Sequence, residues 1–426
     1  MKIKIEKEEE KRVSPWSWVP SLYLAEGLPY VIITVVSVTM YKRMGISNAD
    51  IALYTGWLYL PWVIKPCWSP LVEILKAKRL WIVLTQLFIG AGLAGIALTI
   101  PLSFFFRATL AFFWLLAFAS ATHDIAADGF YLLGLNDKQQ AMFVGIRSTC
   151  YKIATIMGQG LLVMLAGYLE TSGIGLSVAW SITFFISAGT FILLACYHHR
   201  MLPQPLADES HSPQTFRAVV REFSSAFHSF FKKPQILTAL FFMLTFRFSE
   251  AQLLKLISPF LLDSKASGGL GLTTAEVGFA YGTIGIIGLV VGGIIGGISA
   301  SKGGLKRWLW PMTLSMLLTS ATFLYLSFSQ TDNRLLIHFC IVIEQFGYGF
   351  GFTAYVLYLM HFSKGERQTA HYAICTGFMA LGMMIPGMFA GWLQELLGYK
   401  HFFIWVMLSG IVPLVATALL KIRTDE

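Results

Sequence analysis

Long apolar windows alternate with short polar interruptions along nearly the whole chain. A window of 18 or more mostly apolar residues with polar residues on either side is typical of a membrane-spanning helix. The pattern therefore predicts an all-α integral membrane protein with twelve transmembrane helices. We expect these at residues 17–40, 50–73, 80–101, 108–133, 140–169, 176–198, 235–262, 274–300, 307–328, 334–361, 369–396 and 400–420.

The longest polar interruption, residues 199–234, divides the predicted helices six and six. Its second part, Thr215 to Phe231, has apolar residues at helical spacing, with Arg217 and Arg221 on another face. This pattern predicts a helix that lies on a membrane surface. We therefore expect three units, listed here by residue number: a six-helix bundle at 1–198, a cytoplasmic linker with an amphipathic helix at 199–234, and a second six-helix bundle at 235–426.

Similar segments recur at corresponding places in the two sets of six helices. "ISNADIALYTG" (46–56) resembles "LTTAEVGFAYG" (272–282), and "LAGYLE" (165–170) resembles "FAGWLQ" (389–394). The loops "LKAKRLW" (75–81) and "ISASKGGLKRW" (298–308) are also alike. Such an internal repeat predicts two halves of parallel topology, an arrangement that many secondary transporters share.

Composition and charge support a membrane location. The chain is 56% hydrophobic and 13% charged, with a mean hydropathy of +0.65, whereas soluble domains are about 25% charged. The N-terminal stretch "MKIKIEKEEEKRVSPWSW" is too charged for a secretory signal. If that end is inside, the inner termini and loops carry 21 Lys and Arg and the outer loops 6. This bias predicts that both termini face the cytoplasm. The net charge of +9 belongs to these inner loops, so it does not indicate a nucleic-acid partner.

Ten charged residues fall inside the predicted helices. At about 3 kcal/mol each, ten unpaired charges would cost about 30 kcal/mol, more than the stability of a typical protein. Their equal numbers of acids and bases indicate pairing, and their spread over both halves predicts a water-filled cavity between the halves. The bases are Lys65, Arg147, Lys152, Arg247 and Lys255, and the acids are Glu26, Asp124, Asp128, Glu250 and Glu344.

The spacing of these residues suggests different roles. Asp124 and Asp128 are four residues apart and share one helix face, with His123 about 100° round the helix; they are either proton sites or members of structural ion pairs. Arg247 and Glu250 are three apart and can neutralise each other. Of the remaining bases, Lys65 is either an interfacial anchor or a cavity residue, Arg147 either a gating or a binding residue, and Lys152 lies deeper. Glu344 and Gln345 precede the glycine-rich "GYGFG", which would allow close helix packing.

The sequence contains no motif for an enzyme or for ATP. GxxxxGK[ST], GxSxG and HExxH are all absent, and the five cysteines lie in or beside apolar segments without CxxC spacing. We therefore expect no catalytic residue, no cofactor and no metal ligand. Transport driven by an ion gradient remains the favoured class.

Five segments carry a resemblance to a known family: "SLYLAEGLPY" (21–30), "LPWVIKPCWSP" (60–70), "THDIAADGF" (122–130), "CYKIATIMGQG" (150–160) and "QTAHYAICTGFMALGMMIPGMFAGWLQELLG" (368–398). Together they resemble the AmpG-like permeases, which belong to the peptide, acetyl-CoA and drug transporter group of the major facilitator superfamily. The resemblance implies the twelve-helix fold of that superfamily and a location in a bacterial inner membrane.

Individual positions match the family pattern, with some departures. Asp124 and Asp128 match an acidic pair in helix 4, but His123 replaces a Gln. Tyr151 and Lys152 stand where the family has Tyr-Arg, and Glu250 matches an acid early in helix 7. The other departures are Glu73 in place of Asp, Glu26 where many members have no charge, and the lack of two extra helices that some members carry.

The resemblance implies proton-coupled import of N-acetylglucosaminyl-anhydro-N-acetylmuramyl peptides, and the buried charges agree with a proton-coupled mechanism. We therefore expect an importer that works by alternating access as a monomer in the lipid bilayer. Its partners are a small-molecule substrate and protons. The predicted proton-coupling residues are Asp124, Asp128, Glu26, Glu250 and Glu344. The predicted substrate-binding residues are Lys152, Arg147, Lys65, Arg247, His123, Gln345, Tyr30, Trp62 and Tyr151. Two alternatives remain open: an exporter or exchanger of drug-like or acyl-CoA compounds on the same fold, and a transport-inactive cell-wall sensor.

Overall fold

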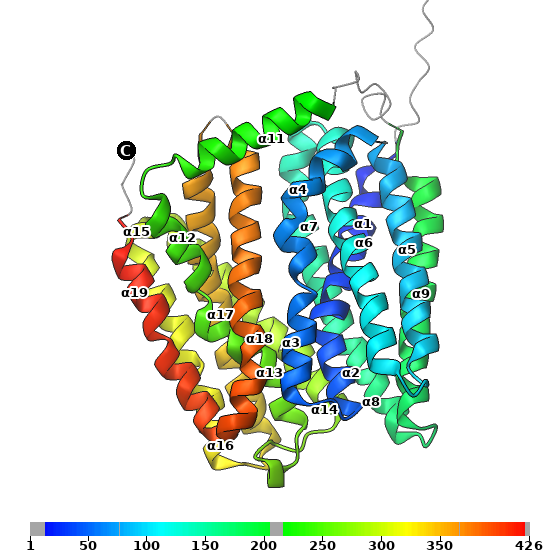
Figure 1. Cartoon of the computed structure of the whole chain (residues 1–426), viewed down its shortest axis with the longest axis vertical. Coiled ribbons are helices and arrows are strands. Elements are labelled where there is room, and N and C mark those ends of the chain that lie inside the picture. The colour runs from blue at the N-terminus through cyan, green and yellow to red at the C-terminus, as the bar shows by residue number, and fades with distance from the viewer. Residues whose placement is uncertain (1–12, 76, 205–215, 366, 422–426) are drawn as a thin grey trace, which may run out of the picture.

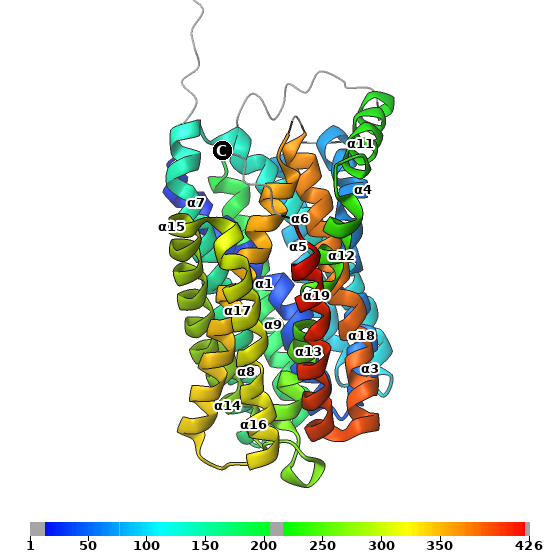
Figure 2. The same ribbon diagram turned by 90° about the vertical axis from the view of Figure 1, so that its left-hand side faces the viewer.

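A computed structural model of the chain describes residues 13–75, 77–204, 216–365 and 367–421. Within these ranges the secondary structure is helical, without strands. Figures 1 and 2 show long helices that run side by side along the longest axis of the molecule. This arrangement agrees with the sequence pattern, because a chain in lipid must satisfy its backbone hydrogen bonds internally.

Helices from Pro15 to Met201 form what we call the first half. Three of its spans are single helices, and three are composite, because a π-helical segment or a short break interrupts them. In chain order the elements are α1 (Pro15–Val31), η1 (Ile32–Val36) and α2 (Ser37–Arg43); α3 (Asn48–Trp57) and α4 (Leu60–Leu75); α5 (Lys78–Thr99); α6 (Phe105–Gly134); α7 (Asp137–Thr155), η2 (Ile156–Leu162) and α8 (Val163–Thr171); and α9 (Leu176–Met201).

The second half runs from Ile236 to Leu419. Its elements are α12 (Ile236–Thr245) and α13 (Phe248–Leu262); the short η3 (Lys265–Ser267); α14 (Thr274–Phe279), η4 (Ala280–Gly285), α15 (Ile286–Thr319) and α16 (Ala321–Ser329); α17 (Arg334–Ser363); and α18 (Gln368–Ser409) and α19 (Ile411–Leu419).

The described residues contain nine helical runs that are long and apolar enough to cross a membrane. Two of these runs, Thr274–Ser329 and Gln368–Leu419, each contain a glycine with a left-handed backbone, at Gly304 (φ 71°) and Gly398 (φ 70°). Glycine adopts this conformation without a steric cost, so the chain can end one span there and start the next. With α3 and α4 as a further span, the described chain has the twelve helices that the sequence predicts.

The repeated segments begin their helices in the same way. Ser47 caps α3 by accepting a hydrogen bond from the backbone of Asp50. At the corresponding place, Thr273 caps α14, and Glu276 completes a capping box. Capping side chains satisfy backbone N–H groups that the first turn of a helix leaves free. The two halves therefore share local structure as well as sequence.

Helix α11 (Phe216–Phe231) connects the halves at one end of the molecule, at the top of Figure 1. We call this the α11 end, and the opposite end, where α14 and α16 lie, the α14 end. Phe230 of α11 is fully buried, with its ring 5.7 Å from that of Phe362 and 6.2 Å from that of Phe378. The helix is present as predicted. Its location on a membrane surface and the unit boundaries at 198 and 234 stay predictions.

The halves touch closely at the α14 end, where two glycines of the repeat lie at matching positions. A Cβ on Gly167 of α8 would lie 2.2 Å from the backbone N of Ala275, at the start of α14. A Cβ on Gly391 of α18 would lie 1.9 Å from the carbonyl O of Asn48, at the start of α3. Only glycine allows such an approach of backbone to backbone.

Polar contacts at the same end follow the same symmetry. Asn48 donates a hydrogen bond to Gln394 at 2.6 Å, and Thr274 donates one to Glu170 at 2.7 Å. In addition, Lys42 of α2 forms an ion pair with Asp263, just after α13, at 2.7 Å. Each half therefore holds the start of a helix from the other half at the α14 end.

Candidate functional site

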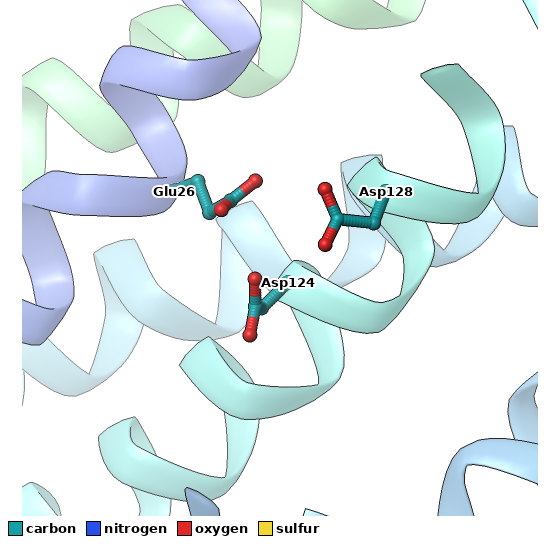
Figure 3. A group of neighbouring side chains, drawn as sticks. All are labelled: Glu26, Asp124 and Asp128. Carbon is teal, nitrogen blue, oxygen red and sulfur yellow. The ribbon is translucent and has the colours of Figure 1, made fainter. Parts of the chain in front are cut away.

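Three carboxylates meet inside the first half. Glu26 comes from α1 and Asp124 and Asp128 from α6, and their oxygens lie within 4.8 Å of one another. Figure 3 shows the two aspartates on one face of α6, with Glu26 facing them from α1. The spacing of four residues predicts the shared face of the aspartates. We call these three residues the carboxylate cluster.

Two bases balance the aspartates. Lys65 of α4 donates to Asp124, and Arg147 of α7 pairs with Asp128 at 2.8 Å. The side chains of Asp124 and Lys65 are 20% and 27% exposed, and those of Asp128 and Arg147 are 41% and 32% exposed. These pairs are therefore only half-buried.

Aromatic side chains hold Asp128 and Arg147 in place. The hydroxyl of Tyr23 donates to Asp128 at 3.1 Å. The Arg147 guanidinium lies over two rings, 4.6 Å from the centre of Tyr23 and 5.4 Å from that of Tyr131. Such cation–π contacts favour the charged arginine at this position.

Glu26 differs from the two aspartates. It is buried, and its Oε2 atom has no hydrogen-bond partner. No ion pair is found for it among the described residues. With all groups ionised, three carboxylates and two bases leave the cluster with a net charge of −1. One added proton neutralises it, and like charges this close favour holding that proton.

The three carboxylates could hold a metal ion by position alone. The donor set argues against this occupant, because Lys65 and Arg147 already bring two positive charges to the aspartates. A proton fits the charge balance better than a divalent cation does.

Arg247 and Glu250 form a compact pair in the second half. Arg247 donates two hydrogen bonds to Glu250, at 2.7 and 2.8 Å, and a third to the Tyr348 hydroxyl at 2.8 Å. Their side chains are only 8% and 2% exposed. The local neutralisation that the spacing predicts is confirmed. This bidentate pair is fully satisfied and carries no net charge.

Glu344 and Gln345 are buried together on α17. Gln345 donates to Glu344 at 2.8 Å, and no base pairs with Glu344 among the described residues. The glycines that follow allow the close packing that the sequence predicts: a Cβ on Gly349 would lie 2.1 Å from the carbonyl O of Leu289. Helix α17 thus packs backbone to backbone against α15.

Lys152 and Lys255 are the two embedded bases that form no ion pair in the described part of the chain. Lys152, on α7, is half-buried. The bases that pair with Asp124 and Asp128 are Lys65 and Arg147, and not Lys152. Lys255, on α13, is 7% exposed and donates to the hydroxyl of Thr55 at 2.9 Å.

The structure places His123 outside the carboxylate cluster, and its contact with substrate stays a prediction. It is fully buried, with its Nε2 atom 2.9 Å from Nε2 of Gln86 on α5. Gln86 also contacts His198 of α9, whose other ring nitrogen lies 2.9 Å from Ser21. His123 points about 100° away from the aspartates and so joins this separate polar chain.

Three aromatic residues predicted to bind substrate lie between the carboxylate cluster and the Arg247–Glu250 pair. They are Tyr30, Trp62 and Tyr151. The ring of Tyr30 on α1 is 5.1 Å from that of Trp62 and 6.3 Å from that of Tyr59. Tyr30 interacts electrostatically with Arg247 and Glu250, and Tyr151 interacts with Glu26 and Asp124. Tyr30, Trp62 and Tyr151 are each partly exposed. They extend from the carboxylate cluster toward the Arg247–Glu250 pair.

Residues 22–385 of the chain match the family model of the Major Facilitator Superfamily. The match covers most of the chain, and the protein therefore belongs to this superfamily of membrane transporters.

The predicted resemblance to AmpG-type transporters is confirmed. The chain is 25% identical over 417 residues to putative transporter AmpG 4 of Rickettsia conorii. This alignment covers 95% of this chain and 96% of that relative. It is 24% identical over 404 residues to the anhydromuropeptide permease of Escherichia coli, covering 92% of this chain and 77% of that one.

Solved structures agree on the fold. The nucleoside transporter NupG superimposes with a TM-score of 0.72 at 15% identity, covering 95% of this chain and 98% of that one. A bacterial homologue of the human lysosomal transporter Spinster, in an inward-facing and unoccupied conformation, also gives 0.72, at 17% identity and with 96% of each chain covered. At these identities the likeness concerns the fold alone.

Proposed function

We propose that this protein is a proton-coupled secondary transporter that imports anionic amino-sugar conjugates by alternating access. The observation that carries the proposal is the carboxylate cluster, which has three acids against two bases. The name of the Escherichia coli relative, an anhydromuropeptide permease, supports anhydromuropeptides from cell-wall turnover as the substrate.

A single proton shared among Glu26, Asp124 and Asp128 would neutralise the cluster and allow the ion pairs to rearrange. Each coupled proton contributes about 1.36 kcal/mol per pH unit and about 2.3 kcal/mol per 100 mV of membrane potential. Glu26 is the natural holder of this proton, because Lys65 and Arg147 already pair with the aspartates. Glu250 and Glu344 remain further proposed coupling residues.

Substrate recognition needs a base that is not already paired. Lys65, Arg147 and Arg247 are held by acids, so Lys152 is the proposed first-half partner of a substrate carboxylate. Partly exposed rings of Tyr30, Trp62 and Tyr151 offer apolar faces for a sugar ring, and Gln345 offers donors and acceptors for its polar groups.

Purified protein in proteoliposomes tests the coupling. We expect wild type to accumulate the anhydromuropeptide disaccharide under an imposed pH gradient. Asp124→Asn or Asp128→Asn should abolish accumulation but keep substrate exchange, which need not release a proton. Full accumulation by both variants would refute the proton role of the aspartates.

The substrate assignment has its own test. The disaccharide should raise the melting temperature of the purified protein, and Lys152→Ala should weaken this shift more than Lys65→Ala does. If a neutral sugar or a CoA ester raises the melting temperature and the disaccharide does not, an exporter or exchanger of other compounds becomes the better assignment. If no compound is transported, the sensor alternative gains support.

We also propose that the protein acts as a monomer in the bacterial inner membrane, with both termini and residues 199–234 in the cytoplasm. The distribution of basic residues supports this topology. In a cysteine-free background, Ser224→Cys on α11 should be labelled only from the cytoplasmic side and Lys400→Cys only from the periplasmic side. The reverse pattern would overturn the orientation.

A further inference from the structure

Lys255 is a buried base for which no acidic partner is found among the described residues. It lies on α13 and is 7% exposed. Its ammonium donates to the Thr55 hydroxyl at 2.9 Å and lies 5.4 Å from the centre of the Tyr59 ring. A hydroxyl and an aromatic face are both neutral partners. Burying an ammonium is costly unless a negative charge compensates for it.

The acids of the second half that lie inside its helices or at the end of α13 have other partners. Arg247 holds Glu250 through two hydrogen bonds, and Gln345 donates to Glu344. Asp263, at the end of α13, pairs with Lys42. An ammonium has three N–H donors, and Thr55 accepts only one of them. Lys255 therefore keeps the capacity to bind an incoming anion.

The position of Lys255 would place such an anion where the two halves of the molecule meet. Lys255 belongs to the second half, whereas Thr55 and Tyr59 belong to the first. Helix α18 does not crowd the lysine, because a Cβ built on Gly387 would meet its Cε atom at 3.6 Å, an ordinary van der Waals contact. An anion bound here would contact groups of both halves at once.

We propose that Lys255 is the second-half anchor for a carboxylate of the transported compound, as the counterpart of the Lys152 anchor proposed for the first half. This inference rests on the proposed function, which supplies an anionic substrate. The two embedded bases without an ion pair in the described part of the chain then come one from each half. A transporter that alternates between two conformations can use them to hold the same anion throughout the movement.

The test compares two forms of one compound in proteoliposome exchange. One is the anhydromuropeptide disaccharide with a free lactyl carboxylate, and the other is its neutral methyl ester. Wild type should exchange the acid about 10- to 100-fold better than the ester, the range of a charge-assisted hydrogen bond. Lys255→Met should lose most of this preference and keep only the part that Lys152 supplies, and Lys255→Arg should retain most of it.

Two further variants separate anion binding from structural support. Thr55→Val removes the hydroxyl but keeps the ammonium, so we expect it to keep the preference for the acid. Lys400→Met removes an exposed lysine and serves as the matched control. If Lys255→Met is not recovered from the membrane, Lys255→Gln replaces it. This variant can still donate a hydrogen bond to Thr55, and its preference for the acid over the ester is measured in the same way.

The outcomes distinguish the two proposals. If wild type exchanges neither compound, the proposed substrate fails. If wild type prefers the acid and Lys255→Met keeps that preference, the anchor role of Lys255 is overturned while the proposed function stands. The same holds if Thr55→Val loses the preference as fully as Lys255→Met, because the lysine then acts only through its contact with Thr55.

Discussion

The two halves bury the same kinds of charged side chain in opposite ways. In the first half, three carboxylates share two bases, and the paired side chains are 20–41% exposed. In the second half, Arg247 and Glu250 match one to one and are at most 8% exposed. The carboxylate cluster with its two bases has an unbalanced charge and partly exposed side chains. The Arg247–Glu250 pair is neutral and buried.

This difference separates two uses of a buried ion pair. A balanced and fully hydrogen-bonded pair has little reason to exchange protons and fixes the geometry of its helix. An unbalanced group changes its net charge with one proton and can therefore respond to a gradient. The variants below test this division, beginning with the largest expected effect.

Removing one partner of the second-half pair should damage the fold most. Glu250→Ala leaves Arg247 buried without its counter-ion, which we expect to cost about 3–5 kcal/mol. Thermal unfolding of the purified protein measures this cost. The double change Arg247→Met with Glu250→Leu should recover much of it, because apolar groups can replace a buried pair. Equal melting temperatures for Glu250→Ala and wild type would contradict a structural role for the Arg247–Glu250 pair, and with it the difference drawn between the two halves.

Glu26→Gln tests the unbalanced carboxylate directly. It removes the negative charge that no base offsets, so the cluster stays neutral at any pH in the working range. We expect the accumulation ratio under a gradient of one pH unit to fall from as much as about tenfold for one coupled proton to near one, with exchange preserved. Asp332→Asn, at an exposed loop acid that pairs with Lys265, is the control. If Glu344→Gln lost accumulation and Glu26→Gln did not, the coupling site would belong to the second half.

An intermediate effect is expected for Lys65→Met. It leaves Asp124 without its base, but both side chains are partly exposed. The cost should therefore lie between those of surface and buried pairs, at about 1–3 kcal/mol. Adding Asp124→Asn should restore the melting temperature without restoring proton-driven accumulation. A double variant no more stable than Lys65→Met would contradict the pairing.

The smallest effects concern the tyrosines that support each group. Tyr23→Phe removes one hydrogen bond to the half-exposed Asp128, and Tyr348→Phe removes one from the buried Arg247. We expect losses of about 0.5–1 kcal/mol for Tyr23→Phe and about 1–1.5 kcal/mol for Tyr348→Phe. Chemical or thermal unfolding of the two variants side by side would show whether the order is correct.

Much of the fold could be predicted from sequence because lipid imposes long apolar helices. The apolar windows gave the twelve spans, and the repeated segments indicated corresponding starts for α3 and α14. Local spacing also predicted what lies within one helix: the shared face of Asp124 and Asp128, and the pairing of Arg247 with Glu250.

Contacts between distant helices could not be predicted in this way. Lys65 and Asp124 are 59 residues apart, and Lys255 and Thr55 are 200 apart. Their meeting depends on how each helix is rotated about its axis, which apolar windows do not specify. His123 shows the same limit, since its neighbours Gln86 and His198 come from two other helices. Lys152 and Lys255 were visible as embedded bases, but nothing in the sequence marked them as the two without an ion pair in the described part of the chain.

The glycines at the α14 end have a consequence for energy conservation. Because Gly167 and Gly391 bring backbone against backbone, the closure at these points does not depend on long side chains that can swing aside. Water has little room to thread between helices packed in this way, and a chain of water molecules is what a proton needs to pass without cargo. For the proton-coupled transport proposed above, tight closure at both glycines would limit passive leak, so that a stored gradient would be kept for productive cycles.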